Sequence, residues 1–246
     1  MLTPRLYVGA EPQLPVPGDD YALADALARH LGQALRMRVG DAVALFTGTG
    51  GEYSATIRSI DRRRVTLRIG QHDPVERETP WPVTLVQSII AADMMDLVVR
   101  KAVELGAATI IPVQAARSQR VSDDRTERRV AHWQRIAIAA CEQCGRNRVP
   151  TLAPVATFAD WIGTAVSPGP VALLDAGGKA SLAAFAAGTP PRAIVAGPEG
   201  GFDAAELRLA RDAGVVPVHM GQRVLRAETA ALAALATVNA LAGDAQ

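Results

Sequence analysis

The sequence predicts an α/β protein in which a small β-rich domain, residues 1–74, precedes a larger domain, residues 75–246, built on a parallel sheet. Apolar residues alternate with polar ones in the first part of the chain, as in strands with one buried face. Apolar strands and amphipathic helices alternate in the second part, which is typical of a parallel sheet covered by helices. Between these parts lies GQHDPVERETPWP, whose three prolines indicate a linker.

The N-terminal domain is expected to contain one short helix, over residues 20–31, and three strands. The segments DAVALF and EYSATIRSI flank TGTGG, whose glycines permit a hairpin turn between two strands. In RVTLRIG, the apolar residues Val65, Leu67 and Ile69 alternate with polar ones, which predicts a third strand with one buried face.

The C-terminal domain is expected to alternate strands and helices from residue 83 onward. The near-continuous apolar segment VTLVQSII predicts a strand buried on both faces. A helix follows, with Met94 and Leu105 on its apolar face and Gly106 at its end. After the strand ATIIPVQA come a polar loop and a long helix, in which we expect Trp133 to be a core residue. Three more strands, in GPVALLDA, RAIVAG and VVPVHMG, precede the apolar final helix, LRAETAALAALATVNALAG.

Composition excludes several classes of protein. No run reaches 18 apolar residues, and the start of the chain does not resemble a signal peptide, so we expect a cytoplasmic protein without membrane attachment. Cys141 and Cys144 form a C-x-x-C pair, but tetrahedral zinc needs four ligands and the chain has no second pair. We therefore expect both cysteines to be structural and predict no metal.

The distribution of charge favours a specific polyanion partner. The net charge is only +1, yet residues 115–150 carry eight arginines against four acids. A local basic patch on a nearly neutral protein suits a defined polyanion site better than non-specific coating of nucleic acid.

The segment GPEGGFDAAEL, residues 197–207, predicts a glycine turn that leads into a helix. Asp203 followed by Glu206 is typical of a capping box, and Gly200 and Gly201 would let a ligand approach the backbone closely. The dinucleotide spacing G-x-G-x-x-G and the phosphate-loop spacing G-x-x-x-x-G-K are both absent. Pro198 also removes an N–H that a phosphate cradle would use. Both nucleotide-phosphate readings are therefore disfavoured.

A second turn in MGQRVLRAETA and a third strand end in LLDAGG would lie beside the first at the carboxyl edge of the sheet. The pocket that they form would offer backbone hydrogen-bonding groups and apolar side chains, with few cations. Such a pocket suits adenosine joined to a thioether or sulfonium better than a polyphosphate.

These motifs carry a family resemblance. AGPEGGF with MGQRVLRAETA resembles the signature of the SPOUT, or trefoil-knot, methyltransferases. Within them the chain resembles the 16S ribosomal RNA (uracil-N3)-methyltransferase family, through RLYV, HLGQALRMRVGD, MDLVVRKAVELGAATIIPVQAARS and IAIAACEQCGRNRVP in family order. One segment departs from the family pattern: AADMMD lacks the basic or glycine residue that usually precedes the Met–acid pair.

The resemblance implies an N-terminal PUA-like β-barrel that binds RNA, a knotted C-terminal domain that binds S-adenosylmethionine, and a homodimer. It implies 16S ribosomal RNA in the 30S subunit as the partner. Together with the three turns, it gives as candidate cofactor-binding residues Leu174, Gly197, Glu199, Gly200, Gly201, Met220, Gly221, Leu225, Arg226, Glu228 and Thr229. The candidate RNA-binding residues are Arg5, Arg36, Arg38, Arg117 and Arg146.

The expected reaction is direct displacement of the sulfonium methyl group by uracil N3. The N3 proton must leave, and either a general base or an arginine that stabilises the developing negative charge could assist. Arg146 is our candidate for the second role, and the identity of any base stays open. Two alternatives are another SPOUT activity, such as 2′-O-methylation of transfer RNA, and a non-catalytic RNA-binding assembly factor.

Overall fold

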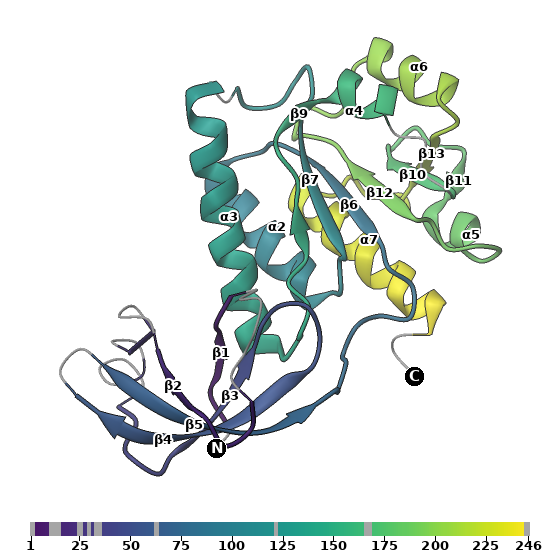
Figure 1. The fold of residues 1–246 in the computed structure, drawn as a ribbon. Coiled ribbons are helices and arrows are strands. Elements are labelled where there is room, and N and C mark those ends of the chain that lie inside the picture. Colours follow the sequence, from purple (N-terminus) through teal and green to yellow (C-terminus); the bar gives the residue numbers. More distant parts are fainter. Residues whose placement is uncertain are drawn as a thin grey trace. The chain divides into compact units, whose positions relative to one another are not determined.

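The computed structural model describes residues 3–9, 16–23, 27–28, 31, 36–61, 64–120, 123–164 and 169–243, without the side chain of Asp123. The chain divides into two compact units (Figure 1). Unit 1 comprises Met1–Arg77 and Cys141–Val149, and unit 2 comprises Glu78–Ala140 and Pro150–Gln246. The shorter part of unit 1 therefore comes from the middle of the chain.

Unit 1 is built on a five-stranded mixed sheet with the order β1-β3-β4-β5-β2. Its strands are β1 (Arg5–Tyr7), β2 (Asp20–Ala22), β3 (Ala42–Phe46), β4 (Glu52–Ile60) and β5 (Val65–Asp73). β1 pairs with β3 in parallel, whereas the other three ladders are antiparallel. The inward-facing residues of the predicted alternation, including Val65, Leu67 and Ile69, are buried in one apolar cluster.

Unit 2 is built on an eight-stranded parallel sheet with the order β11-β13-β10-β12-β6-β7-β8, in which β9 also pairs with β7. The strands are β6 (Thr84–Ser88), β7 (Thr109–Gln114), β8 (Thr151–Leu152), β9 (Ala156–Thr157), β10 (Val171–Leu174), β11 (Ala180–Ser181), β12 (Ala193–Ala196) and β13 (Val216–His219). β10 lies between β12 and β13 although it precedes both in sequence, so the order of the strands reverses there.

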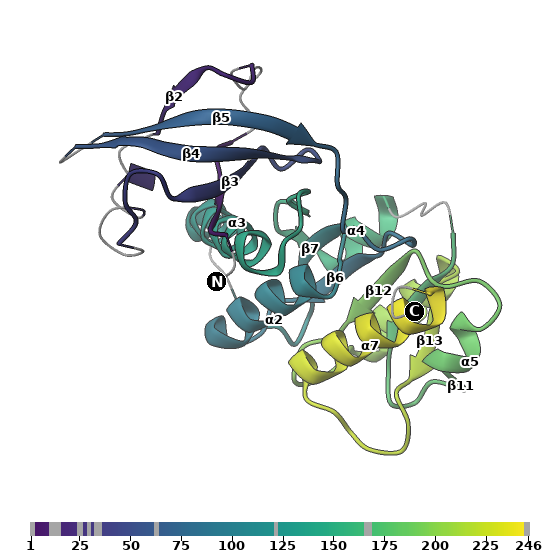
Figure 2. The same ribbon diagram turned by 90° about the horizontal axis from the view of Figure 1, so that it is seen from below.

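The helices of unit 2 cover both faces of this sheet (Figures 1 and 2). They are α2 (Ala92–Glu104), α3 (Asp123–Cys144, whose last four residues group with unit 1), α4 (Phe158–Thr164), α5 (Leu182–Ala186), α6 (Ala204–Asp212) and α7 (Ala227–Ala242). Side chains of α4 and α6 pack with Val86, Val113 and Val195 of the sheet in one apolar cluster. α7 contacts α2, α5, β6 and β12, so it covers the opposite face.

Most predicted elements are present. The hairpin strands, the five longest strands of unit 2 and its four longest helices occur where the sequence predicts them, and Trp133 is buried. The helix expected over residues 20–31 is wrong at its start, because Asp20–Ala22 form β2 and pair with β5. Residues 24–26 and 29–30 of that prediction lie outside the described residues. The α/β class is confirmed, while barrel closure and the trefoil knot stay predictions.

None of the helices in the described part of the chain combines the length and the hydropathy needed to cross a membrane.

Candidate active site

A cavity of about 680 Å³ lies in unit 2 where β10, β12 and β13 end. Residues of three segments at these strand ends line it: Leu174–Ala176, Gly197–Phe202, and Met220, Gly221, Arg223–Glu228 and Ala230. Ala91 and Met94, from the start of α2, complete the wall. The carboxyl ends of parallel strands at a reversal of strand order are the usual place for a ligand in an open α/β sheet. The position and size of the cavity are therefore those of a small-molecule site.

The glycine turn, residues 197–202, connects β12 to α6. Gly201 has φ +66, a left-handed conformation that glycine adopts without strain, and its N–H donates to the carbonyl of Pro198 at 2.9 Å. Asp203 caps α6, and the predicted capping box is present, with Glu206 bonding back to the N–H of Asp203. Because the Asp203 carboxylate accepts the backbone N–H of Glu206, the pKa of Asp203 is lowered. The helix start thus fixes one end of the turn.

Three side-chain contacts connect the glycine turn to its neighbours. The Glu199 carboxylate accepts the N–H of Ala91 at 3.1 Å, just before α2. Arg117 Nη1 donates to the carbonyl of Gly200 at 2.8 Å. Glu206 Oε1 accepts the N–H of Ala116 at 2.7 Å. The segments that follow β6 and β7 are therefore bonded directly to the turn or to the helix it enters.

The departure in AADMMD falls at this point. Ala91 is the N-cap residue of α2, makes no side-chain capping bond, and donates its N–H to Glu199. Met94, which directly precedes the Met95–Asp96 pair, lines the cavity together with Ala91.

The second turn connects β13 to α7. Gly221 has φ +100, and its N–H donates to Nδ1 of His219 at 3.1 Å. Arg226 is the N-cap residue of α7, without a side-chain capping bond.

Ten of the eleven cofactor-binding candidates line this one cavity, and Thr229 does not. Those that line it are Leu174, Gly197, Glu199, Gly200, Gly201, Met220, Gly221, Leu225, Arg226 and Glu228. Sequence reasoning left out Asp175 and Arg223, although both belong to the motifs it had singled out. Ala91 and Met94 belong to AADMMD, which the sequence marked only as a departure from the family pattern and not as part of the cavity, because it lies more than 100 residues before the glycine turn.

The charged groups of the cavity are Asp175, Glu199, Glu228, Arg223 and Arg226. This mixed set suits a ligand that carries both signs, and S-adenosylmethionine has a sulfonium, an ammonium and a carboxylate. The glycine turns add close access to backbone groups for an adenine and a ribose. In the described residues, no group of three or more His, Cys, Asp and Glu side chains could hold a metal ion.

Arg146 lies in unit 1, in the loop of residues 145–149, hereafter the Arg146 loop. The residue is only 4% exposed, so it is not the solvated loop arginine that its position after a helix would predict. The loop is hydrogen-bonded to the β3–β4 hairpin, through Gly50 N–H to Asn147 O at 3.2 Å and Val149 N–H to Gly48 O at 3.1 Å. Asn147 Nδ2 also donates to the carbonyl of Val75 at 2.8 Å.

An ion network in unit 1 holds the same loop. Arg5 pairs with Glu52 and also donates to Asn147 Oδ1 at 2.5 Å and to the carbonyl of Arg146 at 3.2 Å. Arg77 donates to Glu52 at 3.0 Å and to the carbonyl of Gly145 at 2.9 Å. Burial alone would raise the pKa of the Glu52 carboxyl, but the hydrogen bonds from Arg77 and Arg5 outweigh it and lower the pKa to about 2.

The remaining RNA-binding candidates are divided between the two units. Arg36 and Arg38 are exposed in unit 1, where Arg36 has φ +52 and Arg38 donates its backbone N–H to Asp41 at 2.7 Å. Arg5 is 12% exposed and occupied by its network. Arg117 is exposed beside the glycine turn of unit 2.

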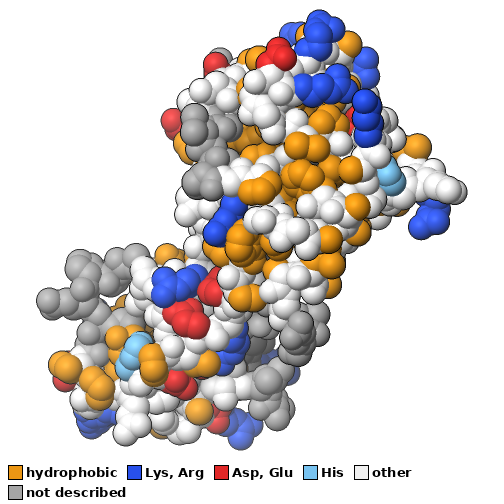
Figure 3. Space-filling view, turned by 90° about the vertical axis from the view of Figure 1, so that its right-hand side faces the viewer, with side chains coloured by type: hydrophobic (Ala, Val, Ile, Leu, Met, Phe, Trp, Pro, Cys, Tyr) orange, Lys and Arg blue, Asp and Glu red, His pale blue; other side chains and the backbone are white. Residues whose placement is uncertain are grey.

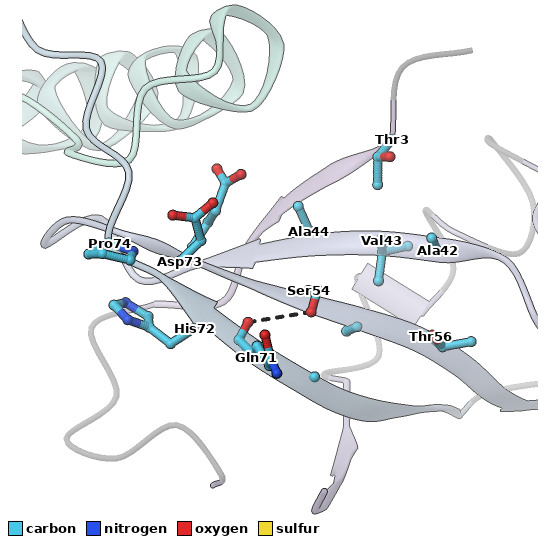
Figure 4. A pocket seen from close by; sticks show the side chains of 13 residues that line it. Thr3, Ala42, Val43, Ala44, Ser54, Thr56, Gln71, His72, Asp73 and Pro74 are labelled. Carbon is cyan, nitrogen blue, oxygen red and sulfur yellow. Dashed lines mark hydrogen bonds between the residues drawn. The ribbon is translucent and has the colours of Figure 1, made fainter. Parts of the chain in front are cut away.

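A second cavity, of about 560 Å³, lies on unit 1 (Figure 4). It forms over β3, β4 and β5, where small residues such as Ala44, Ser54 and Gly70 leave the sheet face open. Asp73 and His72 stand at one end of it (Figure 4). It contains no cation to receive a phosphate, and its lining carries no chemistry for methyl transfer.

The sequence matches two domain families and a close set of relatives. Residues 77–239 match the RNA methyltransferase domain, and residues 23–70 match the RNA methyltransferase PUA domain. The ribosomal RNA small subunit methyltransferase E of Synechocystis is 33% identical over 225 residues, covering 89% of this chain and 72% of that protein.

Solved structures of methyltransferases are similar to this chain over almost its whole length. The ribosomal RNA small subunit methyltransferase E of Neisseria gonorrhoeae, bound to S-adenosyl methionine, is 34% identical with a TM-score of 0.89, covering 98% of both chains. A Legionella pneumophila protein described as a methyltransferase, in complex with the same cofactor, has the same identity, TM-score and coverage. The resemblance inferred from the motifs is thus confirmed, and the chain belongs to the RNA methyltransferase family that includes ribosomal RNA small subunit methyltransferase E.

Proposed function

We propose that the protein transfers a methyl group from S-adenosylmethionine to N3 of a uracil in the 16S ribosomal RNA of the small subunit. The observation that carries the proposal is the unit 2 cavity, where two glycine turns and a third strand end bring ten predicted cofactor-binding residues together. The family to which the chain belongs acts on RNA by methyl transfer. We further propose that residues 1–74 form the RNA-binding domain and residues 75–246 the catalytic domain.

The cavity residues would hold the cofactor by complementary charge and shape. Gly201 and Gly221 leave backbone groups accessible, while Leu174, Met220 and Leu225 supply apolar walls. Among the charged residues, Glu199 and Glu228 could accept from the ammonium or the ribose hydroxyls, and Arg226 could pair with the carboxylate. Thr229 would contribute from the first turn of α7. When bound, the cofactor supplies an electrophilic methyl group on a sulfonium.

The protein must then make uracil N3 a nucleophile. N3 gives up its proton to a base or to solvent water, and negative charge develops on the uracil. The new N–C bond forms as the S–C bond of the sulfonium breaks and a neutral thioether departs. We propose that the Arg146 guanidinium stabilises the negative charge on the uracil. Arg146 is a buried residue, and in a poorly solvated environment the field of its charge acts more strongly than in water. The proton acceptor is not assigned to any residue.

RNA would be positioned by arginines that contact phosphates. Arg36 and Arg38 are exposed and available for this role, and Arg117 would add a contact beside the cofactor cavity. For Arg5, the network with Glu52 and Asn147 supports a role in holding the Arg146 loop. Because N3 lies on the Watson–Crick edge, the target base must be unpaired or flipped out.

We also propose that the enzyme acts as a homodimer. The loop before α7 carries Val224, whose side chain is 87% exposed, and Leu241 near the end of α7 is exposed as well. Hydrophobic side chains gather on the face of unit 2 shown in Figure 3. An apolar face of this kind is typical of a surface that a second subunit covers. A ribosomal substrate would place the dimer in the cytoplasm.

Methyl transfer from labelled S-adenosylmethionine tests the function. Unmodified 30S subunits and protein-free 16S RNA are offered side by side, and the products are digested to nucleosides. We expect label in 3-methyluridine. Label in a ribose-methylated nucleoside would refute the N3 assignment and keep the cofactor site. RNA binding without any cofactor binding would instead favour an assembly factor.

A further inference from the structure

The exposed side of α3 carries three arginines, Arg125, Arg128 and Arg135, which we call the α3 arginine stripe. Their spacing of three and seven residues places them on one side of an α-helix, within about 80° of arc. His132 falls on the same side, and its Nε2 lies 2.8 Å from Asp96 Oδ2 of α2. The stripe is therefore a line of three arginines on a helix side where His132 is already paired with Asp96.

The arginines of the stripe have no acidic partner among the described residues. Among the described residues of unit 2, Lys101 pairs with Glu104 and His132 pairs with Asp96, and neither pair includes the stripe. Arg135 Nε donates only to the carbonyl of Ala131, at 3.3 Å within the helix. Two acids, Asp124 and Glu127, occupy the adjoining side of α3 without pairing with the stripe. Cations that a protein leaves unpaired in a row are available to an anionic partner.

The stripe fits the backbone of a nucleic acid. From Arg125 to Arg135 the helix rises about 15 Å. The stripe is therefore long enough to contact several successive phosphates of one RNA strand. Guanidinium groups also bind phosphate oxygens in a bidentate manner, which favours arginine over lysine at such contacts.

The start of the stripe is connected to the cofactor cavity. Arg117 donates to Gly200 in the glycine turn, and α3 begins six residues after it. Arg120 is exposed in the intervening segment. In Figure 1, the beginning of α3 lies at the same edge of the sheet as the end of β7. The exposed arginines thus follow one another from the mouth of the cavity along the helix.

We propose that the α3 arginine stripe binds the sugar–phosphate backbone of the ribosomal RNA that flanks the target uridine. This inference rests on the proposed function, because it assumes that RNA is the substrate. The stripe adds binding affinity and orients the RNA strand that leaves the cavity. It takes no part in methyl transfer.

The test compares R128Q/R135Q with R208Q/R211Q, which removes two exposed arginines of α6 in the same unit. Each protein is titrated with protein-free 16S RNA at several KCl concentrations, and methyl transfer gives KM and kcat. For R128Q/R135Q we expect the plot of the logarithm of the RNA association constant against the logarithm of the salt concentration to become shallower, its slope decreasing in magnitude by about 1.5 to 2. We expect KM for RNA to rise about tenfold, while kcat and cofactor affinity stay those of the wild type.

The reciprocal change is D124N, which removes the acid beside the stripe and should tighten RNA binding. An equal loss from R208Q/R211Q would overturn the inference, since net charge alone would then explain it. An unchanged slope and KM in R128Q/R135Q would overturn it too, and so would dissociation of the dimer seen by sedimentation. If the wild type methylates no RNA, the proposed function fails, but the salt titration still decides whether the stripe binds RNA.

Discussion

The glycine turn of unit 2 and the Arg146 loop of unit 1 are both irregular segments at functional positions, yet they are held in different ways. The glycine turn is fixed by a helix cap directly after it and by backbone groups of the neighbouring strand ends. The Arg146 loop is fixed by charged side chains far away in sequence, above all the network of Arg5, Glu52 and Arg77. A local helix cap supports the first segment alongside contacts from distant residues, whereas the second depends mainly on charged side chains from distant parts of the sequence.

This difference fits the different groups that the two segments present to their ligands. A turn that presents backbone groups needs a fixed conformation, which capping and glycine supply. A loop that presents a guanidinium needs neighbours that fix its charge, and paired arginines and carboxylates supply those. Variants of the two segments should therefore fail differently, the first in cofactor binding and the second in chemistry or in stability towards acid.

The largest effect is expected for Arg146→Ala. Losing a group that stabilises charge in the transition state should lower kcat about 100-fold or more. The dissociation constant for S-adenosylmethionine should stay unchanged, because Arg146 does not line the cavity. Single-turnover methyl transfer and calorimetry measure the two quantities.

Arg148→Ala is the matched control, since Arg148 lies in the same loop but is 54% exposed and pairs with Glu76 at 3.0 Å. Its kcat should be nearly that of the wild type. Arg146→Lys, with a thermal melt, separates a loss of chemistry from a loss of folding. An equally large fall in kcat for Arg148→Ala would contradict the assignment of Arg146.

Glu52→Ala should have the largest effect on stability. It leaves Arg5, whose side chain is 12% exposed, without its carboxylate, and it also removes a partner of Arg77. We expect the free energy of unfolding to fall by about 2 kcal/mol. Denaturant titration gives this value.

Glu76→Ala is the control. It removes only the exposed pair with Arg148, and the free energy of unfolding should fall by less than about 1 kcal/mol. Equal costs for the two variants would show that burial of the network is unimportant.

The same carboxylate predicts a dependence of stability on pH. The pKa of Glu52 is about 2 in the folded protein, below its ordinary value of 4.5. A lowered folded-state pKa contributes stability that is present above about 4.5 and is lost as the pH falls towards 2. Unfolding measured across this window should therefore show a steeper loss in the wild type than in Glu52→Gln. If the free energies of unfolding of the two proteins changed equally with pH, Glu52 would not stabilise the fold through its network.

The smallest effect is expected for Asp203→Ala, which removes the cap of α6. The free energy of unfolding should fall by about 1 kcal/mol, and the looser glycine turn should weaken cofactor binding a few-fold. Ser181→Ala removes a comparable cap, which accepts the N–H of Ala184 at 3.1 Å before α5. That control should lose stability without losing cofactor affinity. If both variants bind the cofactor equally well, the cap does not support the turn.

The sequence predicted the locally determined features well. The alternation of apolar and polar residues predicted strands β4 and β5 of unit 1. The capping pair Asp203 and Glu206 predicted the start of α6. Glycine turns at strand ends pointed to the cavity, since parallel strands end at a common edge. The short elements β8, β9, β11, α4 and α5 were not predicted, because two to seven residues carry too little periodicity.

Contacts between distant residues could not be read from the pattern. Nothing in the sequence indicates that Glu52 pairs with Arg5, or that Ala91 joins the wall of the cavity. The expected helix over residues 20–31 failed at its start for the same reason, because pairing of Asp20–Ala22 with β5 overrides local preference.

Residues 141–149 complete unit 1, although 63 residues of unit 2 separate them from Arg77, the end of the first part of unit 1. Arg5 reaches its partner Asn147 across a sequence separation of 142 residues. During synthesis, the hairpin of β3 and β4 must therefore wait for much of unit 2 to leave the ribosome before its last hydrogen bonds can form. The loop-closure entropy of such contacts makes them slow to form. The protein that modifies a ribosome would thus finish its own RNA-binding unit late, after more than half of the chain has been made.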